Sequence, residues 1–103
     1  YTKLEALWRM GRAGEMISDP DLQKIRTRAG LAPYTEADLT AEEFLAELGR
    51  EFAWEGHRRQ DMIRFGVWGD TWWNKPPSDP NAKLFPIPQT VLNANPNLVQ
   101  NPM

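Results

Sequence analysis

Apolar residues recur at helical spacing through roughly the first two thirds of the chain. The first such series consists of Leu4, Leu7, Trp8 and Gly11, with charged residues between its members. This i, i+3, i+4, i+7 spacing is typical of an amphipathic helix. We therefore predict a helix at the start of the chain and place its end at Gly14.

A second helix is predicted up to Gly30. Ser18 or Asp19 can cap its N-terminus, and Pro20 suits its first turn because proline has no N–H to lose there. Its buried side is marked by Leu22, Ile25 and Ala29. Residues 31 to 39 then form a connection.

The clearest helix start is at Thr40, three residues before Glu43. This is the spacing of a capping box, in which the threonine hydroxyl accepts from one backbone N–H and the glutamate reaches back to another. The apolar stripe that follows consists of Phe44, Leu45, Leu48 and Phe52. We predict a helix as far as Trp54 or Glu55, a break or kink at Gly56, and a further helical stretch that Gly66 closes.

From residue 67 onward the helical spacing is lost. Seven of the nine prolines follow Lys75. Phe85 and Ile87 each precede a proline and are pushed toward extended geometry, and only residues 89 to 93 suggest a helical turn. Apolar side chains still recur, which favours a strap docked along a helical body. The predicted fold is all-α, with a helical part at 1–65 and an irregular strap rich in proline and asparagine at 66–103, both belonging to one domain.

Composition narrows the class of protein. The chain has 103 residues, 41% of them hydrophobic and 25% charged, which indicates one globular domain. A net charge of −2 argues against nucleic acid as a partner. The chain has no cysteine and no apolar run of the roughly 20 residues that a membrane helix needs. Because it opens on Tyr1 and directly in a helical pattern, we expect it to be part of a longer protein.

Charged residues cluster at regular intervals near the predicted break. They are Glu51, Glu55, Arg58, Asp61 and Arg64, and on a continuous helix they would form a ladder along one side. Acid–base attack on a glycosidic bond needs carboxylates about 5–5.5 or 6.5–9.5 Å apart on opposing sides of the substrate. Acids one turn apart on one helix point the same way, so a structural ion-pair network is favoured and no catalytic residue is predicted.

His57 is the only histidine, and it lacks the partners of a zinc site or a catalytic triad. We expect it to pack and donate a structural hydrogen bond at the Gly56 break. The loop oxygens of Asp70, Asn74, Asp79 and Asn81 suit turns better than a calcium loop. No metal site and no cofactor is predicted.

Trp72, Trp73 and Asn74 are the candidate ligand-binding residues. Indole rings stack on the apolar faces of sugars, and an exposed loop tryptophan is unfavourable unless it is used. Asn74 and Lys75 could hydrogen-bond to sugar hydroxyls beside them. The structural alternative is that one or both tryptophans anchor the loop.

Three longer motifs resemble those of the SusD/RagB family, in the same order. EFAWEGHRRQDMIRFG at 51–66 is similar to the family pattern EFAFEGHRWFDLIRWG, and LFPIPQ and NPNLVQNP are similar to the family's chain ending. The matching positions of the first motif are Glu51, Phe52, Ala53, Glu55, Gly56, His57, Arg58, Asp61, Ile63, Arg64 and Gly66. The later structural positions are Phe85, Pro86, Pro88, Asn95, Pro96 and Asn97. Arg59 and Gln60 depart, because the family has two aromatic residues there.

The resemblance extends from about Gln23 to Met103 and implies the C-terminal part of a SusD-like fold, in which tetratricopeptide-like helix pairs support long irregular segments. It further implies a lipoprotein on the bacterial outer membrane, anchored by a cysteine outside this segment. Such a protein captures an oligosaccharide or other nutrient, without catalysis, for a SusC-type TonB-dependent transporter. The motif residues are expected to hold the fold together rather than touch sugar.

Two other functions are weighed against this one. A helical scaffold could bind a protein partner instead of a glycan. A glycoside hydrolase could use Glu51 or Glu55 together with Asp61, and it would require the two carboxylates to face each other across a cleft.

Overall fold

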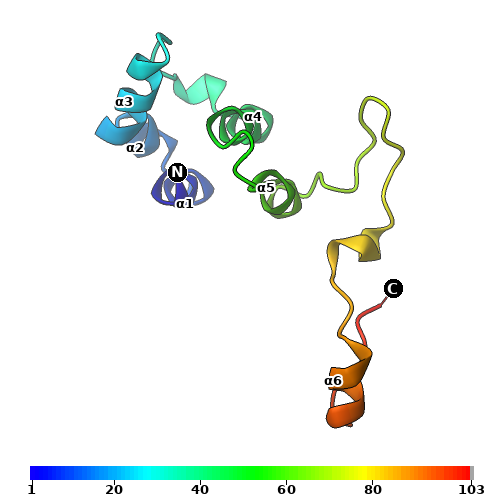
Figure 1. Ribbon diagram of the computed structural model, residues 1–103. Coiled ribbons are helices and arrows are strands. Elements are labelled where there is room, and N and C mark those ends of the chain that lie inside the picture. Colours follow the sequence, from blue (N-terminus) through cyan, green and yellow to red (C-terminus); the bar gives the residue numbers. More distant parts are fainter. Residues whose placement is uncertain (103) are drawn as a thin grey trace. The chain divides into compact units, whose positions relative to one another are not determined.

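The computed structural model describes residues 1–102, which contain six α-helices and two 3₁₀ helices (Figure 1). They are α1 (Thr2–Arg9), α2 (Ala13–Ile17), α3 (Pro20–Arg28), η1 (Glu36–Asp38), α4 (Ala41–Glu51), α5 (Arg58–Arg64), η2 (Pro80–Lys83) and α6 (Gln89–Ala94). Residues 1–102 form no strand and only an isolated bridge between Trp72 and Lys75. The all-α prediction is therefore confirmed. The chain divides into two compact units, Tyr1–Arg58 and Arg59–Met103.

The first helix ends earlier than predicted. Gly11 adopts a left-handed conformation with φ of 73°, and its N–H donates to the carbonyl of Trp8. A residue in this conformation cannot continue a right-handed helix. Gly14 was wrongly placed as the end, because it lies inside α2. A Cβ atom at Gly14 would lie 2.8 Å from an Oε1 atom of Glu36, so the glycine makes room for that side chain.

The predicted limits of α3 are confirmed. The Asp19 carboxylate accepts from the N–H of Asp21 at 3.0 Å, and Pro20 occupies the first turn. Beyond the helix, Gly30 is left-handed, with φ of 69°. The cap at Asp19, the proline at the first turn and the glycine at the end can be read from the sequence because each depends only on neighbours within one turn of the chain.

Thr40 caps α4 as predicted, with its hydroxyl accepting from the N–H of Glu43 at 3.1 Å. The Glu43 carboxylate accepts instead from the Tyr34 hydroxyl and from Arg50, so the second half of the predicted capping box is replaced. A reciprocal capping box is formed at η1, between Thr35 and Asp38. The sequence analysis missed that one.

Helix α4 ends at Glu51, before the predicted end at Trp54 or Glu55. Trp54 has φ of 68° and Gly56 has φ of 78°, and these left-handed residues turn the chain toward α5. The predicted break is therefore present, but it extends from the end of α4 at Glu51 to the start of α5 at Arg58 instead of lying at Gly56 alone. Gly66, with φ of 78°, closes the helical part as predicted.

The first unit is held together by a side-chain core. Phe44, Met16 and Leu22 are fully buried. The ring of Trp8 meets that of Phe44 edge-on at 5.6 Å between centroids, and its Nε1 donates to the Leu39 carbonyl at 3.0 Å. Helix α4 thus contributes its apolar stripe to this core, as its residue pattern predicts.

The second unit is held mainly by turns and amide hydrogen bonds. Gln100 accepts from the N–H of Ile87 at 2.8 Å and donates to its carbonyl at 3.0 Å, while Asn101 donates to the Phe85 carbonyl at 2.7 Å. These bonds fold the chain ending back along the LFPIPQ motif. Helix α6 confirms the predicted helical turn. Docking of the strap on a helical body stays a prediction.

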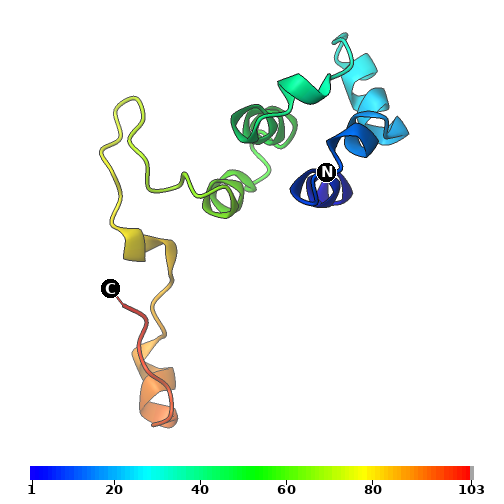
Figure 2. The same cartoon turned by 180° about the vertical axis from the view of Figure 1, so that it is seen from behind.

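In Figures 1 and 2, the segment between α5 and η2 folds back on itself as a hairpin-shaped loop. Among residues 1–102, no helix has the length and apolar character needed to cross a membrane.

Candidate functional site

The candidate ligand-binding residues lie on a tight hairpin. Trp72 and Lys75 exchange two backbone hydrogen bonds, with N···O distances of 3.2 and 2.9 Å. Trp73 and Asn74 are the two central residues of the turn, and Asn74 has φ of 57°. Asparagine adopts this left-handed conformation more readily than most residues. The turn therefore places Trp73 at its tip.

The two indoles of this hairpin differ in exposure. Trp73 is 90% exposed and Trp72 is 50% exposed. The Lys75 ammonium lies 5.7 Å from the Trp72 ring centroid and donates to the carbonyls of Asp70 and Pro76. Lys75 therefore fixes Trp72 against the loop, while Trp73 presents an open ring. The anchoring alternative fits Trp72 better than Trp73.

A pocket of about 320 Å³ lies at the base of the same loop, where Ser78 N–H donates to the Gly69 carbonyl at 3.0 Å. Its lining consists of Ile63, Gly66, Trp68, Gly69, Asp70, Ser78, Pro80 and Lys83. Trp68, Asp70, Ser78 and Lys83 thus border one hollow. This combination of an apolar wall and a few polar groups suits a small polar ligand.

Arg59 occupies a position where the resembling family has an aromatic residue. Its guanidinium lies 5.4 Å from the Trp68 ring centroid and 4.9 Å from that of Phe85. It also donates to the Lys83 carbonyl at 2.9 Å. Cation–π contact with two rings therefore supplies packing at a position where the family side chain is apolar.

The charged residues near the break do not form a ladder on one continuous helix, because α4 ends at Glu51 and α5 begins at Arg58. Glu51 accepts two hydrogen bonds from Arg28, at 2.8 and 2.7 Å. Asp61 pairs with Arg64 at 2.8 Å. Arg58 donates to the Leu45 carbonyl at 2.7 Å. Ion pairing and backbone contacts account for these side chains better than acid–base chemistry does.

Two other motif residues have distinct environments. The His57 ring packs on Phe52 with centroids 4.9 Å apart, which confirms the packing part of its prediction. The structure shows no hydrogen bond from its imidazole to any of residues 1–102. Asp61 is buried, and its Oδ2 atom has no partner within the described part of the chain. Glu55 is exposed.

A buried cluster around Glu47 was not predicted. The Tyr1 and Tyr34 hydroxyls each donate to Glu47 at 2.9 Å, and Arg50 donates at 2.9 Å. The Arg26 guanidinium lies 3.8 Å from the Tyr34 ring centroid and 3.7 Å from Glu47. The one sequence signal was the spacing of Glu43, Glu47 and Arg50 on one side of α4.

Burial alone would disfavour the charge of Glu47. Hydrogen bonds from Arg50, Tyr1 and Tyr34 outweigh that effect, so the pKa of Glu47 lies below its usual range. Burial and the nearby carboxylates raise the pKa of both tyrosines well above the usual range. Glu47 therefore stays charged and both tyrosines stay neutral near neutral pH, which suits a structural cluster.

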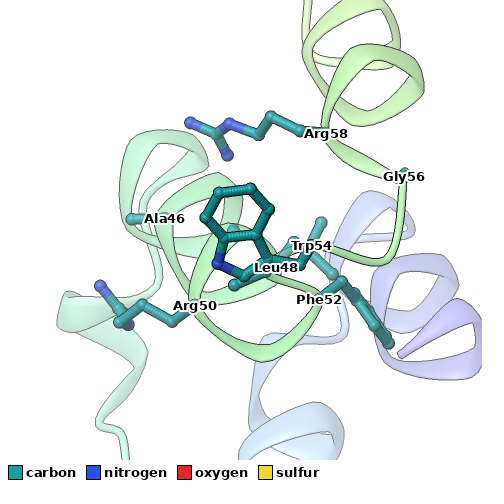
Figure 3. Close-up of a pocket in the computed structure, with 9 residues that line it drawn as sticks. Ala46, Leu48, Arg50, Phe52, Trp54, Gly56 and Arg58 are labelled. Atoms are coloured by element: carbon teal, nitrogen blue, oxygen red, sulfur yellow. The ribbon is translucent and has the colours of Figure 1, made fainter.

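A second pocket, of about 660 Å³, lies in the first unit where α4 ends (Figure 3). Trp54 forms part of its wall, and its side chain is fully exposed at 104%. In Figure 3 the indole lies between the side chains of Arg50 and Arg58. Residues 1–102 contain no group of three or more His, Cys, Asp or Glu side chains placed to hold a metal ion.

Comparison with known proteins identifies a family and a curated relative. The profile of the SusD family matches residues 1–83. The starch-binding protein SusD of Bacteroides thetaiotaomicron is 31% identical over 109 aligned residues. The match covers 97% of this chain and 19% of that protein, so the chain spans about a fifth of its relative's length. No solved structure shows significant similarity.

Proposed function

Because the chain belongs to the SusD family, we propose that the protein binds an oligosaccharide and does not cleave it. The relative's name, starch-binding protein, supports a carbohydrate as the ligand class. The single observation on this chain that supports the proposal most is the ring of Trp73, held open at a hairpin tip.

The hairpin and the pocket at its base can serve the two kinds of contact that sugars make. Trp73 offers a flat apolar face for stacking on a pyranose ring. Asp70, Ser78 and Lys83 offer an acceptor, a hydroxyl and a donor for sugar hydroxyl groups. Asn74 follows Trp73 in the turn, where its amide can reach the same ligand. We therefore assign ligand contact to Trp73 first and to Trp72 and Asn74 second.

The location of the protein, its anchor and its transporter partner are proposed from its membership of the family. We propose that the protein lies on the outer-membrane surface, held by a lipid anchor outside these 103 residues. It passes its nutrient to a SusC-type TonB-dependent transporter. Within the tetratricopeptide-like frame of the family, this chain supplies the C-terminal part. The motif residues Glu51, Arg58, Asp61 and Arg64 serve the fold.

A protein-binding scaffold is the second candidate. Phe85 is 74% exposed and Val99 is also largely exposed, and such side chains suit a protein surface better than a sugar. This candidate predicts binding to the transporter that persists when every glycan is absent.

Calorimetric titration of the intact protein with plant, host and bacterial oligosaccharides tests the glycan proposal. We expect saturable binding of one glycan class and no product on long incubation. Trp73→Ala should weaken binding about tenfold, which corresponds to roughly 1.4 kcal/mol. Trp73→Tyr is the matched control, because it keeps an aromatic face and should retain most of the affinity.

Two results would count against the proposal. Absence of binding at millimolar concentration across the panel would favour the protein scaffold. Accumulation of shorter glycans that copurifies with the protein would indicate a glycosidase.

A further inference from the structure

Arg59 connects the two segments that line the pocket at the base of the hairpin loop. These segments are residues 63–70 and residues 78–83. The Arg59 guanidinium lies 5.4 Å from the ring centroid of Trp68, in the first segment. It donates to the carbonyl of Lys83 at 2.9 Å and to that of Ala82 at 3.4 Å, both in η2 of the second segment. One side chain therefore ties the indole to the 3₁₀ helix.

The contacts of Arg59 go to rings and carbonyls rather than to an acid. Ile63, one turn further along α5, lines the pocket, so residues 59 and 63 share one face of that helix. A second ring, that of Phe85, lies 4.9 Å from the guanidinium. Arg59 is half-buried, and no carboxylate of residues 1–102 pairs with it. Its planar, charged group can therefore face the rings while its N–H groups reach the carbonyls.

The groups that Arg59 connects are ones that a polar ligand can use. Trp68 supplies an indole, and Lys83 supplies an ammonium that no acceptor within residues 1–102 engages. Two groups from separate segments bind one ligand more tightly when their spacing is fixed beforehand. By itself η2 is a short element, closed by the Leu84 N–H at 2.9 Å from the Asn81 carbonyl. A tie from outside that element therefore matters to where its ammonium lies.

We propose that Arg59 is a positioning residue for ligand binding. It fixes the spacing between Trp68 and η2, so that the indole and the Lys83 ammonium contact one glycan together. Arg59 is not one of the residues that line the pocket, and it acts through those two. The inference rests on the proposed function, because it assigns glycan contact to this pocket, but it is separate from the role of Trp73 at the hairpin tip.

Hydrogen exchange of the intact, ligand-free protein tests the positioning step alone. Arg59→Met keeps an apolar stem and removes the charge and the donors. We expect the Leu84 amide, which closes η2, to exchange about fivefold faster in this variant, because η2 opens more often. The Lys75 amide in the hairpin should be unaffected. Gln60→Ala, at the exposed neighbouring position of α5, is the control and should change neither amide.

Two results of this measurement would overturn the inference, whether or not the protein binds a glycan. One is equal exchange of the Leu84 amide in Arg59→Met and in the unmodified protein. The other is faster exchange of both the Leu84 and the Lys75 amides, which would mean that the substitution loosens the whole unit rather than the spacing of η2.

Coupled substitutions, followed by calorimetric titration with the glycan, test the link to the ligand. In the unmodified background, Lys83→Met should weaken binding about tenfold through loss of a charge-assisted hydrogen bond. In the Arg59→Met background the same change should weaken it only about twofold, because the ammonium is no longer held where the ligand needs it. A residue that only stabilises the fold would leave the effect of Lys83→Met unchanged, so equal effects in both backgrounds would overturn the inference.

The two experiments separate failure of this inference from failure of the proposed function. If the unmodified protein binds no glycan while Leu84 exchange still responds to Arg59→Met, the proposed function fails, and Arg59 is a tie within the fold without a role in binding. If a glycan binds and Lys83→Met has no effect in the unmodified background, the proposed function stands through Trp73. The inference is then overturned, because the ligand does not use this pocket.

Discussion

The two units of the chain are stabilised in different ways. In Tyr1–Arg58, the apolar side chains of Phe44, Met16 and Leu22 are fully buried. In Arg59–Met103, order comes from turns and from the amides of Gln100 and Asn101. The first unit illustrates folding by burial of apolar area. The second shows that a segment with few buried apolar side chains can still be ordered by satisfying its backbone polar groups.

Phe44→Ala tests the core of the first unit and should have the largest effect. Removing a fully buried ring costs about 3–5 kcal/mol of the free energy of unfolding, through lost transfer free energy and the cavity left behind. Chemical denaturation of the intact protein measures this cost. Phe44→Leu is the control and should cost distinctly less. Equal stability of Phe44→Ala and the unmodified protein would show that α4 does not form this core.

Glu47→Gln tests the polar cluster of the same unit. The substitution replaces one carboxylate oxygen by an amide that faces donors, so we expect a loss of about 1.5–3 kcal/mol at pH 7. Glu42→Gln, at an exposed position of the same helix, should have little effect. A loss no greater than that of Glu42→Gln would mean that the cluster contributes nothing net.

The same pair of variants predicts a pH dependence. Folding lowers the pKa of Glu47 below its unfolded value of about 4.3. Its contribution is therefore complete above the unfolded pKa and is lost as the pH falls through the folded pKa. The unmodified protein should lose stability in acid more steeply than Glu47→Gln does, as measured by thermal unfolding between neutral pH and pH 3. Parallel curves would contradict this assignment.

Sequence analysis located the helices of both units better than the contacts among them. The caps at Asp19 and Thr40 and the closing glycine Gly66 were predicted because each acts within one turn of chain. The Glu47 cluster was not, because it requires Tyr1, which is 46 residues away. No local rule specifies which distant side chain will reach a buried carboxylate.

For the candidate site too, the sequence predicted the local placement of residues but not their geometry. Trp72, Trp73 and Asn74 were correctly placed in a loop, but the hairpin was missed because Trp-Asn is not among the usual two-residue turns. The break after α4 was expected at Gly56, whereas Trp54 is already left-handed. A bulky residue rarely adopts that conformation, so its position cannot be read from propensity.

Phe85→Ala asks whether the second unit gains a core elsewhere in the intact protein. Its ring is 74% exposed, so these contacts alone predict a change of about 0.5 kcal/mol or less. If the strap docks on a helical body, as its apolar pattern predicts, we expect a cost of about 1–2 kcal/mol. Thermal unfolding of the intact protein distinguishes the two. A change no larger than that of Thr90→Ala, at an exposed position of α6, would argue against docking.

Asn74 should show the most local effect, confined to the hairpin of the second unit. A left-handed conformation costs an ordinary L-residue about 1–2 kcal/mol, whereas glycine adopts it freely. We therefore expect Asn74→Ala to open the hairpin more often and to speed hydrogen exchange at the Lys75 amide, which donates to the Trp72 carbonyl at 2.9 Å. Asn74→Gly removes the same side chain and should keep the slower exchange. If both variants exchange equally fast, the amide side chain rather than the backbone conformation holds the turn, and the open presentation of Trp73 would then depend on Asn74 itself.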